Sequence, residues 1–420
     1  MTYQNLRAKY PKFVYESFST DGNTLTFEYS ISEHHFTHKV TFENIQNLKF
    51  DAQLVFNLGM AEIFSYWKLT CSPVIEIRAG HLPDDQIKFW EKLLIKGMGQ
   101  YFYENKINFT QKDFLKIKSM GKLFENCELK IENSRVLVPL GGGKDSIVTA
   151  ELLKPHFKIQ PIIVYPATPA SIRISKIITD TPPIIVHRIL DPHMIELTNQ
   201  GHLTGHVPYS AILAFLFLIP GYKYIAVSHE RSSEEGNVEY LGHSINHQYS
   251  KTFEFETDFN KYLRTINITP LSLPLKLRGG NPKGEGDIKY FSFLRSLYEL
   301  QISKLFSQMP RYFNEFRSCN KNQQQNSWCG HCPKCVSTAL LLKPFLSKDK
   351  IIEIIGSYPP DDPANPDLRI IKPFECILTL AEATATYSGK GLDKILSSWQ
   401  DNPNMPKEFT KILKDAYENS

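Results

Sequence analysis

The sequence has little net charge, no long run of basic residues and no apolar run long enough to cross a bilayer. Its 48 lysine and arginine residues against 44 aspartate and glutamate residues give a formal net charge of +4, so a broad nucleic-acid-binding surface is not indicated. The longest apolar stretch, 211–220, is about half of the roughly 20 residues that a membrane-spanning helix needs. The first residues show no signal-peptide pattern. We therefore expect a cytoplasmic protein with neither a nucleic-acid nor a membrane partner.

Cysteine is also scarce, with seven residues in 420, and four of them lie within seventeen positions. This group, with the spacing C-x9-C-x2-C-x2-C, consists of Cys319, Cys329, Cys332 and Cys335. In a reducing compartment such crowding predicts a metal site rather than disulfides. Four thiolates suit a tetrahedral structural Zn²⁺, with His331 as a substitute ligand. A 4Fe–4S cluster or a set of free thiols are the alternatives, although the Cys-Pro ending typical of ferredoxins is missing.

Two common nucleotide-binding motifs are absent: the P-loop pattern G-x-x-x-x-G-K-[ST] and the dinucleotide turn G-x-G-x-x-G. The chain instead has Gly141-Gly142-Gly143-Lys144-Asp145-Ser146 between the apolar run 136–140 and the helix-forming run 147–153. Glycines permit positive φ and bring backbone N–H groups close to a ligand, and a helix N-terminus favours phosphate. We interpret the segment as a phosphate-binding loop, since a plain strand-to-helix turn needs no Lys-Asp-Ser.

Residues 1 to about 130 predict an α+β accessory domain. The segments 13–18, 25–31 and 36–42 alternate apolar with polar residues, which is typical of an antiparallel meander. An amphipathic helix, a short strand and a second helix are expected at 54–69, 74–77 and 83–103.

From Arg135 onward, strand and helix patterns alternate, which predicts a parallel sheet with helices on both faces. The expected strands are 136–140, 159–165, 184–189 and 224–227, and the expected helices are 147–153, 171–178 and 211–218. A polar connection with several glycines, 278–287, is expected to be either a lid or a plain surface loop. It is followed by a helical pattern from about 288 to 309. We therefore predict an α/β fold with an N-terminal domain at 1–130, a parallel-sheet domain at 131–346 and a helical C-terminal region at 347–420.

A group of polar residues follows the strand expected at 224–227. The segment Ser228 to Asn237 contains His229, Glu230 and Glu234, and polar residues after a strand are where sites of α/β proteins form. A charged surface loop is the alternative. The segment 201–208, which contains His206, is similar but less dense in polar groups.

The loop Gly141 to Ser146 resembles the phosphate loop of the N-type ATP pyrophosphatases, the PP-loop superfamily, usually written S-G-G-x-D-S. Gly141 stands in the place of the usual serine, which removes one hydroxyl donor. In that superfamily the loop holds the β- and γ-phosphates as a leaving pyrophosphate while AMP is joined to a substrate oxygen. The cysteine spacing resembles the zinc loop of the deazaguanine-forming members of the same superfamily, which favours a structural zinc.

Further segments together resemble one branch, the ATP-dependent UDP-N-acetylmuramoyl-L-alanyl-L-glutamate epimerases of peptidoglycan synthesis. The resemblance covers most of the chain and rests on residues 66–68, 89–90, 97–105, 141–146, 205–208, 228–237, 328–335 and 372–376. It implies an enzyme that inverts the terminal L-glutamate of the UDP-linked dipeptide to D-glutamate and consumes ATP and Mg²⁺.

The resemblance also implies roles for particular residues. Lys144 and the amides of Gly141, Gly142 and Gly143 would hold phosphates, Ser146 would donate from the helix start, and Asp145 would bind Mg²⁺. Adenylation of the glutamate carboxylate would make its α-proton removable as an enolate. The candidate bases are His229, Glu230, Glu234 and His206, with Cys376 as a further thiol candidate.

The rival interpretation is a tRNA- or nucleobase-modifying ATP pyrophosphatase, which adenylates a ring carbonyl. It would use catalytic rather than metal-bound cysteines and would present a basic surface.

Overall fold

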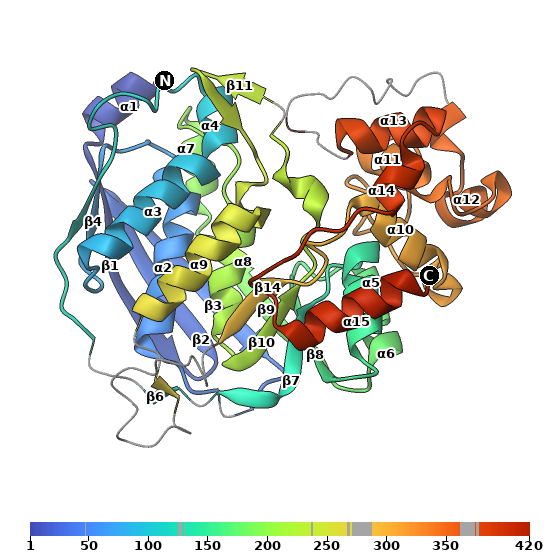
Figure 1. The fold of residues 1–420 in the computed structure, drawn as a ribbon. Helices are drawn as coiled ribbons and strands as arrows, with labels where there is room; N and C mark the ends of the chain where they lie inside the picture. Colours follow the sequence, from blue (N-terminus) through green and yellow to red (C-terminus); the bar gives the residue numbers. More distant parts are fainter. Residues whose placement is uncertain are drawn as a thin grey trace. The chain divides into compact units, whose positions relative to one another are not determined.

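The computed structural model describes residues 1–46, 48–124, 128–129, 131–236, 238–266, 269–270, 288–361, 374 and 378–420 (Figure 1). The chain forms two compact units, and each is assembled from segments far apart in the sequence. The first unit contains Met1–Asn133, Val186–Lys223 and Val238–Ile288, and the second contains Ser134–Ile185, Tyr224–Asn237 and Lys289–Ser420. The chain first passes from one unit to the other between Asn133 and Ser134.

The first unit is built on the predicted antiparallel meander. Its strands β1 (Lys12–Asp21), β2 (Thr24–Ile31) and β3 (His34–Glu43) pair in chain order. Two further strands, β4 (Val74–Ile77) and β5 (Lys116–Ser119), extend the sheet beyond β1 in parallel. The alternation in the sequence therefore predicted this sheet correctly, because one face of it is buried.

Helix α2 (Ala52–Trp67) is buried along almost its whole length and contacts β1, β2 and α8 (Tyr209–Leu218). The Asp51 carboxylate caps its first turn by accepting the N–H of Leu54 at 2.9 Å. A helix with apolar residues on every side belongs in a core. Its Glu62 is a fully buried charged group, and it therefore requires a partner.

The predicted helix at 83–103 is two helices, α3 (Asp84–Gly97) and α4 (Gly99–Glu104), which are interrupted at Met98. Both glycines are needed for close packing, because a Cβ on Gly97 would lie 2.8 Å from Pro208 and one on Gly99 would lie 2.8 Å from Ile245. The remaining elements of the unit are α1 (Tyr3–Lys9), β6 (Glu128–Leu129), α7 (His193–Asn199), β11 (Val238–Tyr240), β12 (His243–Ile245), α9 (Phe253–Thr265) and β13 (Thr269–Pro270).

The second unit has the predicted strand and helix alternation. Its strands lie in the order β14 (Lys289–Ser292), β10 (Tyr222–Val227), β7 (Glu132–Pro139) and β8 (Lys158–Tyr165), and the pairs β14/β10 and β7/β8 are parallel. Helices α5 (Lys144–Leu153) and α6 (Pro169–Ile178) follow β7 and β8. Strand β9 (Ile184–Ile189) then carries the chain into the first unit. The fold is thus mixed α/β with a mostly parallel sheet.

The helical pattern predicted at 288–309 is wrong in its first part. Residues 289–292 form β14, which pairs with β10, and the helix α10 (Glu299–Ser307) begins only after a turn. Tyr290 and Phe291 are buried in the sheet. Pairing with β10 has therefore overridden the local helical periodicity of this segment.

Helices after residue 333 complete the second unit and include α11 (Pro333–Leu342), α12 (Lys348–Ile355), α13 (Leu380–Ser388), α14 (Leu392–Leu396) and α15 (Lys407–Glu418). Apolar side chains of α13 and α14 pack with those of α10 and α11. Figure 1 shows these four helices grouped together in orange and red. Helix α15 packs against α5 and joins the core that surrounds β7 and β8. The predicted connection 278–287 lies outside the described residues. Across the described ranges, no helix combines the length and hydropathy that a membrane crossing needs.

Glu62 is paired with Arg188 inside the first unit. The Arg188 guanidinium donates to both carboxylate oxygens, at 2.7 and 2.5 Å, and to the Ser65 hydroxyl at 2.7 Å. His38 Nε2 lies 3.3 Å from the same carboxylate. Burial alone would raise the pKa of Glu62, but Arg188 and His38 hold it at about 2. The stabilising contribution of Glu62 is therefore complete above its unfolded pKa near 4.5 and is lost as the pH falls toward 2.

We predict that Arg188→Met lowers the free energy of unfolding by about 3–5 kcal/mol at pH 7, because it leaves a buried carboxylate without its cation. The unpaired carboxyl should then have a raised pKa, so the loss should be smaller at pH 5 than at pH 7. Urea unfolding followed by circular dichroism at both pH values measures this. The double variant Glu62→Gln/Arg188→Met is the control and should recover part of the stability at pH 7. An equal loss at both pH values would contradict the assignment.

Candidate functional site

The glycine loop lies between β7 and α5, as predicted. Gly142 has φ +87°, and a Cβ there would lie 3.0 Å from Thr168 Oγ1 and 3.1 Å from the backbone nitrogen of Ser171. Both the backbone conformation and the space therefore require glycine at this position. Gly141 is exposed, with nothing within 4 Å of a Cβ, so a serine would fit there.

Helix α5 starts at Lys144 with Gly143 as its N-cap and has no side-chain cap. The N–H groups of its first turn are thus not occupied by a capping side chain, and the helix dipole places positive potential at the loop. The Ser146 hydroxyl donates to Gly143 O at 3.0 Å, which closes the loop on itself. These features fit the chemistry of a phosphate group.

Lys144 is buried, and its ammonium lies between two carboxylates. Nζ donates to Asp145 Oδ1 at 2.5 Å and to Glu299 Oε2 at 2.6 Å. Burial lowers the pKa of Lys144, but the charges of Asp145 and Glu299 outweigh burial and raise the pKa above its usual value. The side chain is therefore charged, and in these contacts one cation faces two anions.

Sequence reasoning missed Glu299, which is the first residue of α10. Its backbone N–H donates to Ser232 Oγ at 3.0 Å, and the next N–H, of Leu300, donates to Glu382 Oε1 at 2.9 Å. The signal that could have located this helix start is Gln301, whose side chain accepts the N–H of Tyr298 at 2.9 Å as in half of a capping box. Because a single helix was predicted through 288–309, no helix start was expected at Glu299.

Glu382 on α13 was also missed. It is fully buried, and its other oxygen accepts from the Thr379 backbone at 3.1 Å and the Thr379 hydroxyl at 2.9 Å. Burial, with the nearby charge of Glu299, raises the pKa of Glu382 to about 7. The C-terminal helices are thus connected through α10 to the lysine of the glycine loop.

The polar segment after β10 lies beside the residues that lead into α10 and contacts its first residue. The fully buried Arg295 donates to the backbone carbonyl of Glu230 and to Glu234 Oε1, both at 2.8 Å. Glu234 is therefore held in an ion pair, and the Glu230 side chain is itself buried. His229 Nδ1 lies 3.4 Å from Ser292 Oγ at the end of β14. Ser232, through Glu299, joins this segment to Lys144.

His206 belongs to the first unit, whereas His229, Glu230 and Glu234 belong to the second. Its Nδ1 is buried with no hydrogen-bond partner among the described residues. Lys68 Nζ donates to the carbonyl of the neighbouring Gly205 at 3.1 Å. Burial, with the charge of Lys68, lowers the pKa of His206 to about 4, so its imidazole is neutral at pH 7. The thiol candidate Cys376 and the end of the polar segment, Asn237, lie outside the described residues.

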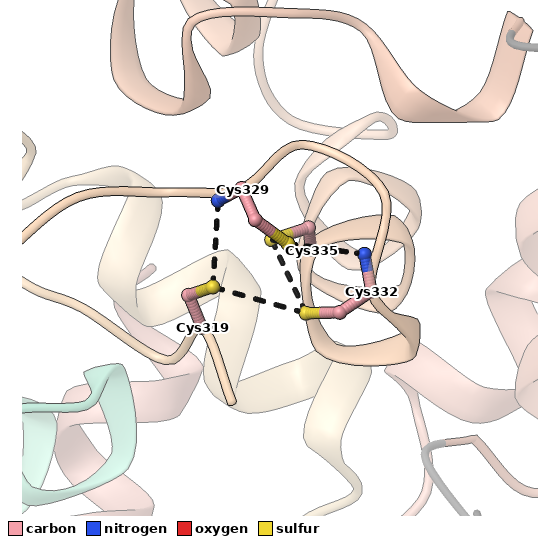
Figure 2. A group of neighbouring side chains, drawn as sticks. All are labelled: Cys319, Cys329, Cys332 and Cys335. Atoms are coloured by element: carbon pink, nitrogen blue, oxygen red, sulfur yellow. Dashed lines mark hydrogen bonds between the residues drawn. The ribbon is translucent and has the colours of Figure 1, made fainter. Parts of the chain in front are cut away.

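The four clustered cysteines converge, as Figure 2 shows. Their sulfur atoms all lie within 4.8 Å of one another, and three Sγ pairs, 319/332, 329/335 and 332/335, are 3.9, 3.8 and 3.4 Å apart. A tetrahedron with metal–sulfur bonds of about 2.3 Å has edges of about 3.8 Å, so the spacing fits a single ion. An iron–sulfur core between the sulfurs would hold them farther apart. His331 is exposed and is not part of the group.

Backbone N–H groups surround the thiols. That of Asn322 donates to Cys319 Sγ at 3.3 Å. Figure 2 shows two further bonds, from the N–H of Cys329 to Cys319 Sγ at 3.4 Å and from the N–H of Cys332 to Cys329 Sγ at 3.3 Å. Cys332 and Cys335 also lie at the N-terminus of α11. Backbone N–H groups that donate to sulfur in this way are typical of the surroundings of metal-bound cysteines. Within the described residues, this is the one cluster of cysteine, histidine and acidic side chains that could hold a metal.

Models of two domains of one protein family together match almost the whole chain. The family model described as the MurL N-terminal domain matches residues 4–270, and the MurL C-terminal domain matches residues 315–418. The first range contains the glycine loop and the four candidate bases, and the second contains the cysteine cluster. No solved structure shows a significant match.

Three curated relatives are each named UDP-N-acetyl-alpha-D-muramoyl-L-alanyl-L-glutamate epimerase. The protein of Salinispora tropica is 28% identical, over 93% of this chain and 86% of its own length. That of Xanthomonas oryzae pv. oryzae is 29% identical, over 74% of this chain and 69% of its own. That of Micromonospora sp. is 29% identical, over 73% and 67%.

We predict that the chain as purified holds about one metal ion in the cysteine cluster, and that Cys332→Ser reduces both metal content and stability. The reason is that a closed four-thiolate site stabilises its loop through the ion. Elemental analysis and thermal unfolding measure the two effects, and Cys71→Ser is the control, since this buried thiol lies in the other unit. Cys71→Ser should keep the metal. Fresh protein without metal, or with iron and a visible absorption band, would contradict a single-ion zinc-type site.

Proposed function

This chain belongs to the MurL family, and on that basis we propose that it inverts the terminal L-glutamate of UDP-N-acetylmuramoyl-L-alanyl-L-glutamate to D-glutamate in peptidoglycan precursor synthesis. The observation that carries the proposal is the match of both MurL domains, together with the epimerase name shared by the three relatives. The glycine loop adds a place where a nucleotide would bind, which an epimerase acting on a free carboxylate needs.

A role for ATP is consistent with the chemistry of the substrate. Removing the α-proton next to an ionised carboxylate places a second negative charge on that group, which is a large barrier for a side-chain base. We propose that the glutamate carboxylate attacks the α-phosphorus of ATP, that pyrophosphate leaves, and that an acyl-adenylate forms. Its carbonyl can then delocalise charge as an enolate when the α-proton is removed. Return of a proton to the opposite face and hydrolysis of the anhydride give the D-glutamate product and AMP.

The residues around the glycine loop fit this role. The amides at the start of α5 and the charged Lys144 would hold the phosphates, and Asp145 would bind Mg²⁺, which neutralises phosphate charge when bound. Glu299 would hold Lys144 in place until the nucleotide arrives. The loop makes the chain a proposed member of the N-type ATP pyrophosphatase superfamily.

We propose His229 as the base on one face of the α-carbon. Of the three candidates after β10, Glu234 is paired with Arg295 and the Glu230 side chain is buried, whereas His229 has a hydroxyl beside Nδ1 that can orient its ring. His206 is the second candidate. Its pKa of about 4 leaves the imidazole unprotonated at neutral pH but also makes it a weaker base than an ordinary histidine.

The cysteine cluster would have a structural role and would hold Zn²⁺. Its four thiols face one another and none is left for attack on a substrate, while Cys71 is buried, with a pKa that burial raises to about 11. The nucleobase-modifying alternative needs a reactive cysteine, and among the described residues nothing supports one.

We predict that the chain converts ATP to AMP and pyrophosphate only when the UDP-muramoyl dipeptide is present. Lys144→Gln should lower the rate roughly a hundredfold or more, because it removes a positioned charge at the phosphates but keeps donors for both carboxylates. Lys154→Gln is the matched control, since this residue follows the same helix and pairs with Glu151 on its surface. Chromatography of the nucleotides measures the products. Formation of ADP and phosphate would refute the proposal.

We further predict that turnover in D₂O places deuterium at the glutamate α-carbon, and only when ATP is present. His229→Asn should abolish deuterium incorporation but keep pyrophosphate release in the first turnover, because adenylation precedes proton removal. Mass spectrometry of the product and a rapid-quench pyrophosphate assay measure the two steps. His156→Asn, an exposed histidine of the same unit, is the control. Full exchange in variants of all four candidate bases, or a product that keeps its original α-hydrogen, would overturn the enolate mechanism.

A further inference from the structure

Arg317 lies directly beside the glycine loop, two positions before the first cysteine of the cluster. Its backbone N–H donates to Gly142 O at 2.9 Å. The hydroxyl of the next residue, Ser318, lies 3.2 Å from the position that a Cβ on Gly143 would take. Gln323 Nε2 approaches Gly141 O at 3.5 Å. The segment 317–323 therefore lines the loop at each of its three glycines.

The Arg317 side chain is a half-buried cation. Its Nε donates to Asn326 O at 3.0 Å and its Nη1 donates to Phe316 O at 2.7 Å. These carbonyls fix two of its nitrogens but supply no negative charge. No carboxylate among the described residues lies within ion-pair distance of it. Glu315 is paired with the neighbouring Arg173 at 2.5 Å, and its charge acts on Arg317 only at longer range.

A partly desolvated guanidinium without a carboxylate is costly unless an anion joins it. The glycine loop shows which anion the site would take, because Lys144 already faces two carboxylates in Asp145 and Glu299. In these contacts two carboxylates face one ammonium group, so a further cation at the loop would favour a nucleotide that remains negative as its Mg²⁺ complex.

We propose that Arg317 is a second phosphate-binding cation of the nucleotide site, and that its guanidinium contacts the phosphates that leave as pyrophosphate. This proposal rests on the proposed function, in which the glycine loop binds ATP. A guanidinium offers two parallel N–H groups to one phosphate, and the N–H groups not used by Asn326 and Phe316 are available for this. The metal loop thereby supplies a residue to the ATP site, in addition to its structural role.

The test is a titration of the full-length, metal-loaded chain with MgATP and, separately, with magnesium and inorganic pyrophosphate, by isothermal calorimetry. Arg317→Gln should weaken both affinities about tenfold or more, as expected for loss of a charge-assisted hydrogen bond. Arg317→Lys keeps the charge but not the planar guanidinium, so its affinities should lie between those of the wild type and those of Arg317→Gln. Arg311→Gln is the matched control, because this exposed arginine of the same unit pairs with Glu151. Its affinities should equal those of the wild type.

Metal content and the thermal unfolding midpoint distinguish a role of Arg317 in phosphate binding from a purely structural role in the loop. If Arg317→Gln keeps both and loses affinity for pyrophosphate, the proposal is supported. If it keeps affinity, or if affinity falls only together with metal content, the proposal is wrong and Arg317 only braces the loop. If Arg317→Gln binds MgATP as the wild type does, the proposed function still stands. If the wild type binds neither ligand, the proposed function fails as well.

Discussion

The second unit depends on one buried ammonium group, that of Lys144, held between Asp145 and Glu299. A buried cation must have its carboxylates in place, so the start of α5 and the start of α10 are fixed relative to each other. The N-terminus of α10 is in turn bonded to Ser232 after β10 and to Glu382 on α13. The Lys144–Glu299 contact and the two backbone bonds at the start of α10 thus join the glycine loop, the polar segment and the C-terminal helices, which together span more than 200 residues of sequence.

The parts of this arrangement that could be predicted are those that short stretches of sequence determine. The glycine loop requires Gly142 for its positive φ, and the four cysteines lie close enough in the sequence for their convergence to be expected. The meander and the strand and helix alternation followed from periodicity in the same way. Each of these features is determined by residues that lie near one another in the sequence.

The parts that could not be predicted depend on long-range pairing. Residues 289–292 have a helical pattern and become a strand because β10 is available beside them, so the start of α10 and Glu299 were misplaced together. Glu382 and Arg317 are ordinary charged residues in the sequence, and only their contacts reveal them. His206 shows the opposite case: its sequence surroundings resemble those of the other candidate bases, but it belongs to another unit with its own neighbours.

The balance of charge distinguishes two kinds of buried ion group in this protein. Glu62 with Arg188, and Glu234 with Arg295, each match one anion with one cation, and a balanced pair needs nothing further. In the contacts that the structure describes, Lys144 faces the two carboxylates of Asp145 and Glu299, and Arg317 nearby has no carboxylate within ion-pair distance. Desolvated charge is costly unless an opposite charge joins it. Under the proposed function, the carboxylates would suit a divalent cation and the guanidinium would suit phosphate, so a magnesium nucleotide would satisfy both groups.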